Sequence, residues 1–159
     1  HKFEQKGEDV KTIQQLVDLE VNMGLGKVNG TNNSYQGIPK QSEFYTHVGS
    51  ARTVERVLRF LIFVQRIIEN MYNNRQESLT VCIKNAYDKE LGPHHNFFLR
   101  SAVKGIVYLL PDRETFINGL INEEKMGKVD DDRVYSIMKE LIDNSEKITS
   151  SMFYILCIE

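Results

Sequence analysis

The chain of 159 residues contains no tryptophan, only three prolines and only two cysteines. Two cysteines are too few for the dense disulfide framework of a small secreted domain. Cys82 and Cys157 both lie in apolar helical patterns, so we expect buried thiols and a reducing compartment. No apolar run is long enough to cross a membrane, because Arg59 and Arg66 interrupt the longest one.

A strong charge of one sign is also missing. The chain has 20 lysines and arginines against 22 aspartates and glutamates, which gives a net charge of −2. This balance excludes the global basic field of a nucleic-acid-binding protein, so any anion site must be local. Hydrophobic residues make up 41% of the chain and charged residues 26%, which is typical of a globular domain with a real core.

Signals for metal binding and catalysis are weak. His94 and His95 are adjacent and would point to different sides of a helix, while His47 and His1 have no ligand spacing around them. Neither cysteine lies near a positive charge or a helix start, and no glycine-rich phosphate loop occurs. The acidic run 130–132 is what a helix N-terminus attracts. We therefore expect no enzyme activity, no metal and no cofactor.

Almost every periodic segment predicts a helix, and no strand alternation is longer than a few residues, so the predicted fold class is all-α. The expected helices cover residues 9–23, 50–72, 77–91 and 94–110, a short segment after Asp112, and a last long segment from near Asp131. Ser50 is a plausible N-cap, and Pro111 should end the fourth helix. Residues 24–49 are predicted to form a long polar loop.

Two arginines at the start of the most apolar helix are the strongest candidates for a binding site. Arg52 and Arg56 are four residues apart and share a helix face, which Arg59 extends. Like charges at this spacing repel by a few tenths of a kcal/mol. An anion between them removes this cost, because guanidinium groups bind phosphate in a bidentate way. The alternative is the solvated charged edge of an amphipathic helix.

One histidine lies in a different context from the others. His95 is expected at the start of a helix whose apolar face carries Phe98, Ala102 and Val103. A histidine at such an edge can donate a hydrogen bond to a buried polar group of a ligand. A capping or surface histidine is the alternative, and the pattern alone leaves both open.

Three segments together resemble the glycolipid transfer protein family. Residues 12–20, TIQQLVDLE, resemble its "TLQ-x-(I/M)-(L/V)-x-x-E" helix. Residues 52–59, RTVERVLR, resemble the "RTV-x-R-L-x-R" helix of its ceramide-1-phosphate-transferring branch. Residues 82–117 follow its "Y-x-x-x-L-x-x-x-H-x-W" helix pair through Tyr87, Leu91 and His95.

The resemblance implies one domain over residues 1–159, a two-layer all-α sandwich that encloses a lipid chain between its layers. In this family the positions of Arg52 and Arg56 bind the phosphate, and the position of His95 hydrogen-bonds the ceramide amide carbonyl. The apolar pocket would include Leu91, Phe98 and Ala102. The implied function is non-enzymatic binding or transfer of a sphingolipid with a phosphate headgroup, most simply ceramide-1-phosphate. The implied setting is the cytoplasm, with transient contact to a membrane surface and no nucleic acid.

Departures from the family pattern qualify this interpretation. The sugar-binding branch has a tryptophan at the position of Arg56 to stack on the sugar, so this chain should not prefer a glycolipid. The membrane-contacting tryptophan of the family is Phe97 here. The family's headgroup aspartate lies on a helix upstream of residues 12–20, so we expect a domain truncated at its N-terminus that could self-associate. A helical interaction module without lipid cargo is the alternative function.

Overall fold

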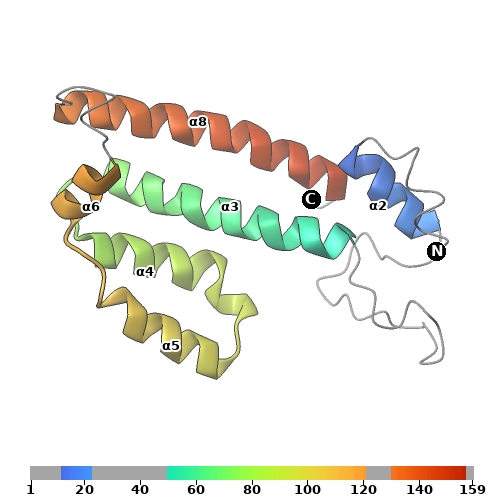
Figure 1. Cartoon of the computed structure of the whole chain (residues 1–159), viewed down its shortest axis with the longest axis horizontal. Helices are drawn as coiled ribbons and strands as arrows, with labels where there is room; N and C mark the ends of the chain where they lie inside the picture. The colour runs from blue at the N-terminus through green and yellow to red at the C-terminus, as the bar shows by residue number, and fades with distance from the viewer. Residues whose placement is uncertain (1–11, 23–49, 121–129, 157–159) are drawn as a thin grey trace. The chain divides into compact units, whose positions relative to one another are not determined.

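The computed structural model describes residues 12–22, 50–120 and 130–156 (Figure 1). These residues form helices without any strand, which confirms the all-α prediction for this part of the chain. The helices are α2 (Ile13–Asn22), α3 (Ser50–Asn73), α4 (Leu79–Glu90), the 3-10 helix η1 (Gly92–His94), α5 (Phe97–Val107), α6 (Arg113–Leu120) and α8 (Asp131–Leu156). Among them, no helix combines the length and apolar character that a membrane crossing requires. The predicted loop over residues 24–49 and the predicted thiol at Cys157 lie outside the described residues.

The chain divides into two compact units. Residues 1–58 and 148–159 form the first, and residues 59–147 form the second. Helices α3 and α8 therefore contribute residues to both units. A single domain over residues 1–159 stays a prediction.

A buried carboxylate lies at the start of α3 in the first unit. Glu20 of α2 is only 1% exposed, and its two oxygens accept hydrogen bonds from the backbone N–H of Ser50 at 2.6 Å and from its hydroxyl at 2.9 Å. A negative group at a helix N-terminus satisfies free N–H groups and interacts favourably with the helix dipole. Ser50, the predicted N-cap, is instead the first helical residue, and a side chain from another helix does the capping.

The core of the second unit joins residues of α3, α4, α6 and α8. Met71, Leu79, Cys82 and Met138 are its buried members. Partly buried apolar residues around them include Ile67, Ile68, Tyr72, Ile83, Leu110, Phe116, Ile117, Val134 and Tyr135. Within this unit α4 lies beside α3 in Figure 1. Cys82 is 1% exposed and free, as predicted, and burial raises the pKa of its thiol.

One guanidinium group closes the C-terminus of α3. Arg113 of α6 donates hydrogen bonds to the carbonyl oxygens of Asn74 at 3.0 Å and Glu77 at 3.1 Å, and also to the carbonyl of Met71. It also reaches the Tyr135 hydroxyl at 3.1 Å. The last carbonyls of a helix have no partner within the helix, and a cation suits their negative dipole end. The turn from α3 into α4 is therefore held by a side chain from a later helix.

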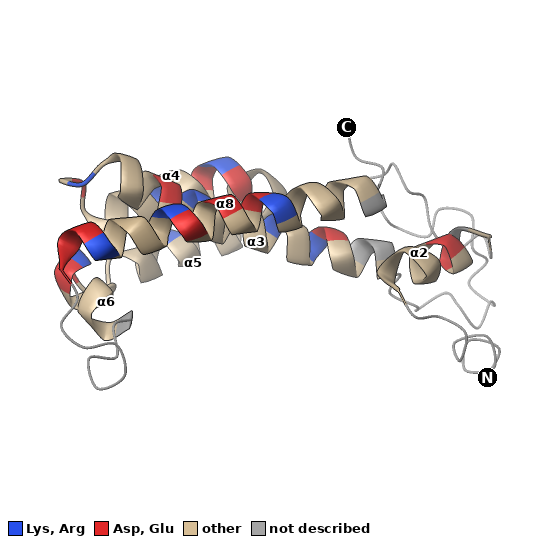
Figure 2. Cartoon of the chain, turned by 90° about the horizontal axis from the view of Figure 1, so that it is seen from above, with Lys and Arg blue, Asp and Glu red and all other residues tan. Residues whose placement is uncertain are grey.

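Polar side chains also define other helix ends. Ser78 caps α4, with its Oγ accepting the Val81 N–H at 3.3 Å. Asp112 caps α6 as predicted, because its carboxylate accepts the backbone N–H and the hydroxyl of Thr115, both at 2.8 Å. These two hydrogen bonds hold the pKa of Asp112 below its usual value. Along α8, charged residues of both signs follow one another (Figure 2), which is typical of a solvated face.

The Arg113 contacts generate a stability prediction. Arg113→Met removes the donors to three carbonyl groups while retaining much of the apolar stem, so the free energy of unfolding should fall by roughly 2–3 kcal/mol. Urea denaturation of the 159-residue chain followed by circular dichroism measures this change. Arg133→Met, at an exposed position of α8, is the matched control and should change the value by less than about 0.5 kcal/mol. Equal effects of the two substitutions would show that the contacts at the end of α3 contribute nothing.

Candidate functional site

The two predicted phosphate-binding arginines lie one helical turn apart in the first part of α3. The helix is continuous through residues 52–56, so both positions fall on one face, as their spacing predicts. Arg56 is exposed and has no hydrogen-bond or ion-pair partner among the described residues. Arg59 differs, because it is half-buried and already has an interaction partner. An anion could therefore reach Arg56 without displacing an ion pair to any described residue.

His95 does not lie at a helix start, so that part of the prediction was wrong. The helix expected over residues 94–110 is split into η1 and α5, and α5 ends at Val107, before the predicted stop at Pro111. His95 lies between η1 and α5 in an extended conformation, with φ −101° and ψ 143°. Pro93 occupies the first turn of η1, where its missing N–H costs nothing. Asn96 then caps α5, with its side-chain oxygen 2.9 Å from a backbone N–H of the first turn. This local break turns His95 out of the helical register.

Three contacts fix the orientation of His95. The Tyr87 hydroxyl lies 2.9 Å from its Nδ1, and the two ring centroids are 5.6 Å apart. Arg100 of α5 donates from Nε to the His95 carbonyl at 2.8 Å. The His95 backbone N–H donates to the Gly92 carbonyl at 3.2 Å. Contacts from η1 and α5 therefore hold the backbone of His95, and Tyr87 of α4 orients its half-buried imidazole.

The contact with Tyr87 bears on which ring nitrogen of His95 carries a proton. Tyr87 is 3% exposed, and burial raises the pKa of its hydroxyl above the ordinary value, while Arg100 partly opposes this rise. The hydroxyl thus keeps its proton at neutral pH and can donate it to Nδ1, which lies within hydrogen-bond distance. We assign the proton of this contact to the Tyr87 hydroxyl, which leaves the ring proton on Nε2, an atom with no hydrogen-bond partner among the described residues. A neutral donor of this kind suits an amide carbonyl.

The residues predicted to line an apolar pocket lie at the same corner and along α5. Leu91 is half-buried where α4 meets η1. Phe98 is 82% exposed, and Ala102 and Ile106 follow it at four-residue spacing on the exposed side of α5. Phe97, which stands where the family has a tryptophan, is also largely exposed. This apolar stripe begins three residues after His95, and its role as a lipid pocket stays a prediction.

Metal chemistry has no support in the described parts of the chain. There, no group of three or more histidine, cysteine, aspartate or glutamate side chains is placed to hold a metal ion. The expectation that Cys82 lies far from a positive charge and a helix start was wrong, because it lies in the first turn of α4 near Arg113. Burial nevertheless raises the pKa of its thiol, which makes it a poor nucleophile.

Comparison with known families places these features in context. The family model for glycolipid transfer protein (GLTP) matches residues 1–122, which is more than half of the chain. The chain belongs to the glycolipid transfer protein family. The search of curated proteins gives no match.

Solved structures with the same fold include two ceramide-1-phosphate complexes. A mutant of the Arabidopsis accelerated-cell-death 11 protein, complexed with C12 ceramide-1-phosphate, has a TM-score of 0.69 and 18% sequence identity over 96% of this chain. The human ceramide-1-phosphate transfer protein, complexed with 12:0 ceramide-1-phosphate, has a TM-score of 0.65 and 19% identity over 92% of this chain. The chain spans 64% of the length of each of these proteins. At this identity the similarity shows the fold, and it confirms the predicted glycolipid-transfer type.

Sequence reasoning missed how this member of the glycolipid transfer protein family holds its histidine. Tyr87 was recognised only as a family motif position, and Arg100 was not singled out. Tyr87 precedes His95 by eight residues, and the Gly92-Pro93 break folds the chain back so that the two rings meet. The break is visible in the sequence, but the direction of the fold-back is not.

The tautomer of His95 can be measured directly. In Tyr87→Phe, Nδ1 loses its donor, so the neutral imidazole should become a mixture with a substantial population protonated at Nδ1. Nitrogen-15 chemical shifts of the ring, recorded above the histidine titration range, report this population. Tyr108→Phe, which alters an exposed tyrosine, should leave the ring shifts unchanged. A parent protein already protonated at Nδ1 would contradict the assignment.

Proposed function

We propose that this chain binds a sphingolipid with a phosphate headgroup, ceramide-1-phosphate, and carries it between membranes without a covalent step. The observation that carries the proposal is His95, whose imidazole contacts Tyr87 through Nδ1 and whose Nε2 has no hydrogen-bond partner among the described residues. Two proteins of the same fold are complexed with ceramide-1-phosphate, which supports this cargo. The arginines on one face of α3 supply the cations that a phosphate requires.

The mechanism divides affinity from selection. Arg52 and Arg56 bind the phosphate through their guanidinium groups, and His95 donates from Nε2 to the amide carbonyl. The hydrocarbon chains supply most of the affinity, since each buried methylene contributes about 0.8 kcal/mol. The polar groups then decide which headgroup is accepted. Phe97, exposed at the first residue of α5, provides the transient contact with a membrane surface from the cytoplasmic side.

Headgroup selection is tested by lipid transfer between vesicles. The protein should move ceramide-1-phosphate and leave galactosylceramide nearly untouched, because the arginine side chains offer cations in place of an aromatic platform for a sugar. Arg56→Ala should reduce ceramide-1-phosphate transfer about tenfold, the loss of one charge-assisted contact, without lowering the melting temperature. Arg133→Ala removes an exposed charge on α8 and serves as the control.

Equal transfer of the two lipids would refute phosphate selection. The proposed contact between His95 and the lipid amide is tested by comparing two substitutions in the same assay. His95→Gln keeps a hydrogen-bond donor and should retain more lipid binding than His95→Leu. Parent-like binding by both variants would show that His95 does not contact the lipid.

A helical interaction module is the second candidate function, and one observation favours it. On α5 and just beyond it, Phe98, Ile106 and Leu109 are 82%, 59% and 84% exposed. Exposed apolar surface of this kind usually marks an interaction site. A second copy of the chain could cover this stripe without any lipid.

Self-association is therefore expected for the 159-residue chain. Size-exclusion chromatography with light scattering should give a mass above the 18.4 kDa of one chain, because the stripe on α5 is uncovered. Phe98→Ser combined with Leu109→Ser should lower the measured mass towards that of a monomer. Thr115→Ser, a mild change at an exposed site of α6, should not. A parent chain that is already monomeric and transfers lipid normally would remove the support for the interaction module.

A further inference from the structure

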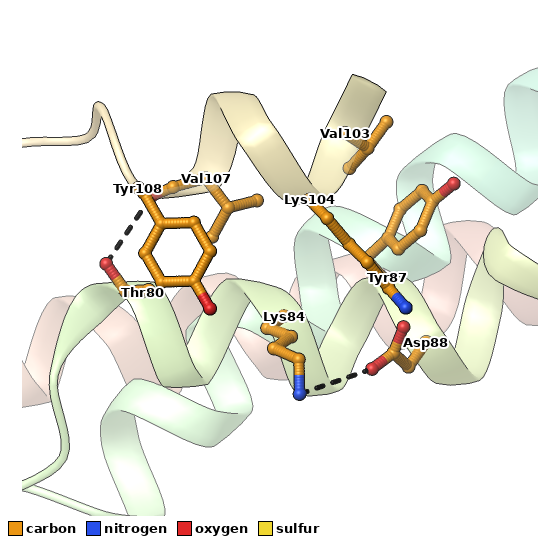
Figure 3. A pocket seen from close by; sticks show the side chains of 8 residues that line it. All are labelled: Thr80, Lys84, Tyr87, Asp88, Val103, Lys104, Val107 and Tyr108. Carbon is orange, nitrogen blue, oxygen red and sulfur yellow. Dashed lines mark hydrogen bonds and ion pairs between the residues drawn. The ribbon is translucent and has the colours of Figure 1, made fainter. Parts of the chain in front are cut away.

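A pocket of about 280 Å³ lies between α4 and α5, and the proposed lipid-binding residues do not line it. Its lining residues are Thr80, Lys84, Tyr87, Asp88, Val103, Lys104, Val107 and Tyr108 (Figure 3). All of them belong to the second compact unit. The volume lies just below the usual range for ligand pockets, so an occupant must be small.

The walls of this pocket are held by the fold. Val107 is 6% exposed, and its carbonyl accepts a hydrogen bond from the Thr80 hydroxyl at 3.4 Å, which ties the start of α4 to the end of α5. Tyr87 forms another wall, and its hydroxyl is turned away from the lysines in Figure 3, towards its partner His95. Because these side chains already have partners, the pocket does not depend on a ligand to form.

The polar groups of the pocket carry a net positive charge. Lys84 of α4 pairs with Asp88 at 3.8 Å, while Lys104 of α5 has no hydrogen-bond or ion-pair partner among the described residues. Figure 3 shows the Asp88 carboxylate between the two ammonium groups. One carboxylate can compensate only one of two lysines, so the pocket has one cation left over. Valine side chains and a tyrosine ring next to these charges offer apolar contact.

We propose that this pocket binds a small organic anion, a phosphate monoester with a short apolar body. The phosphate would lie against Lys104 and Lys84, since ammonium groups form charge-assisted hydrogen bonds with phosphate oxygens. The apolar body would lie against Val103 and Val107. No arginine of α3 lines the pocket, and the inference does not depend on ceramide-1-phosphate being the transferred lipid.

The experiment titrates the full 159-residue chain with hexyl phosphate and follows backbone amide signals by NMR. Saturable shifts are expected at Thr80, Val103 and Val107, together with a change in the His95 ring signals transmitted through Tyr87. Inorganic phosphate carries the charge without the body, and hexanol carries the body without the charge. If both parts of hexyl phosphate contribute, inorganic phosphate and hexanol should each bind at least about tenfold more weakly than hexyl phosphate. Inorganic phosphate lacks the few buried methylenes, and hexanol lacks the charged contact.

Lysine variants then test the charge. Lys104→Ala should weaken hexyl phosphate binding about three- to tenfold, the range for one solvent-exposed charge contact, and Lys104→Arg should restore it. Lys89→Ala removes an exposed lysine of α4 outside the pocket and should have no effect. Equal loss with Lys89→Ala, or inorganic phosphate binding as tightly as hexyl phosphate, would overturn the proposal.

The source of the phosphate and the independence of the site are measured separately. Arg56→Ala should leave the shifts at Val103 and Val107 intact, whereas shifts confined to residues near Arg56 would show that only the α3 arginines bind the anion. Vesicles containing phosphatidic acid should compete with hexyl phosphate at the pocket if the phosphate comes from a lipid headgroup. Absence of competition assigns the pocket to a soluble phosphate monoester. No saturable shift with any phosphate monoester would refute the site.

Discussion

The C-terminus of α3 is the constraint on which the second unit depends. The last carbonyl groups of a helix have no partner within the helix. Arg113 donates to one of them, that of Met71, and to the carbonyls of Asn74 and Glu77 in the turn that follows, and it reaches Tyr135 of α8 as well. One side chain from α6 thereby holds the turn that leads into α4. The position of α4, and hence of Tyr87 on it, follows from this turn.

Tyr87 contributes both to the surroundings of His95 and to the pocket between α4 and α5. Its hydroxyl orients His95, and its ring forms a wall of the pocket between α4 and α5. Gly92 allows the chain to pass close to the backbone of Tyr87, since a Cβ at position 92 would lie only 3.2 Å from the Tyr87 carbonyl oxygen. The imidazole is thus oriented by a residue that is 3% exposed. Pre-organisation of this kind lowers the entropy lost when a ligand binds.

The sequence predicted those features of the fold that depend on residues close to one another in the chain. The helical periods, the Asp112 cap and the burial of Cys82 follow from neighbouring residues, and the structure has all three. The capping of α3 by Glu20 joins residues thirty positions apart, and no local pattern encodes it. The Arg113 contacts also join residues far apart in the sequence, so no local pattern predicts them. The break between the third and fourth helices was predicted, but the start of α5 at Phe97 was missed because Asn96 was not taken as its N-cap.

The same distinction applies to the candidate site. Helix periodicity was enough to place Arg52 and Arg56 on one face, because residues four apart align on any α-helix. The contact between His95 and Tyr87 needed the structure, since the two rings meet across a turn. A neutral donor has a specific advantage beside an amide carbonyl. In the proposed function it would supply a hydrogen bond without adding a charge that must be desolvated on binding, so discrimination by charge would rest with the arginines.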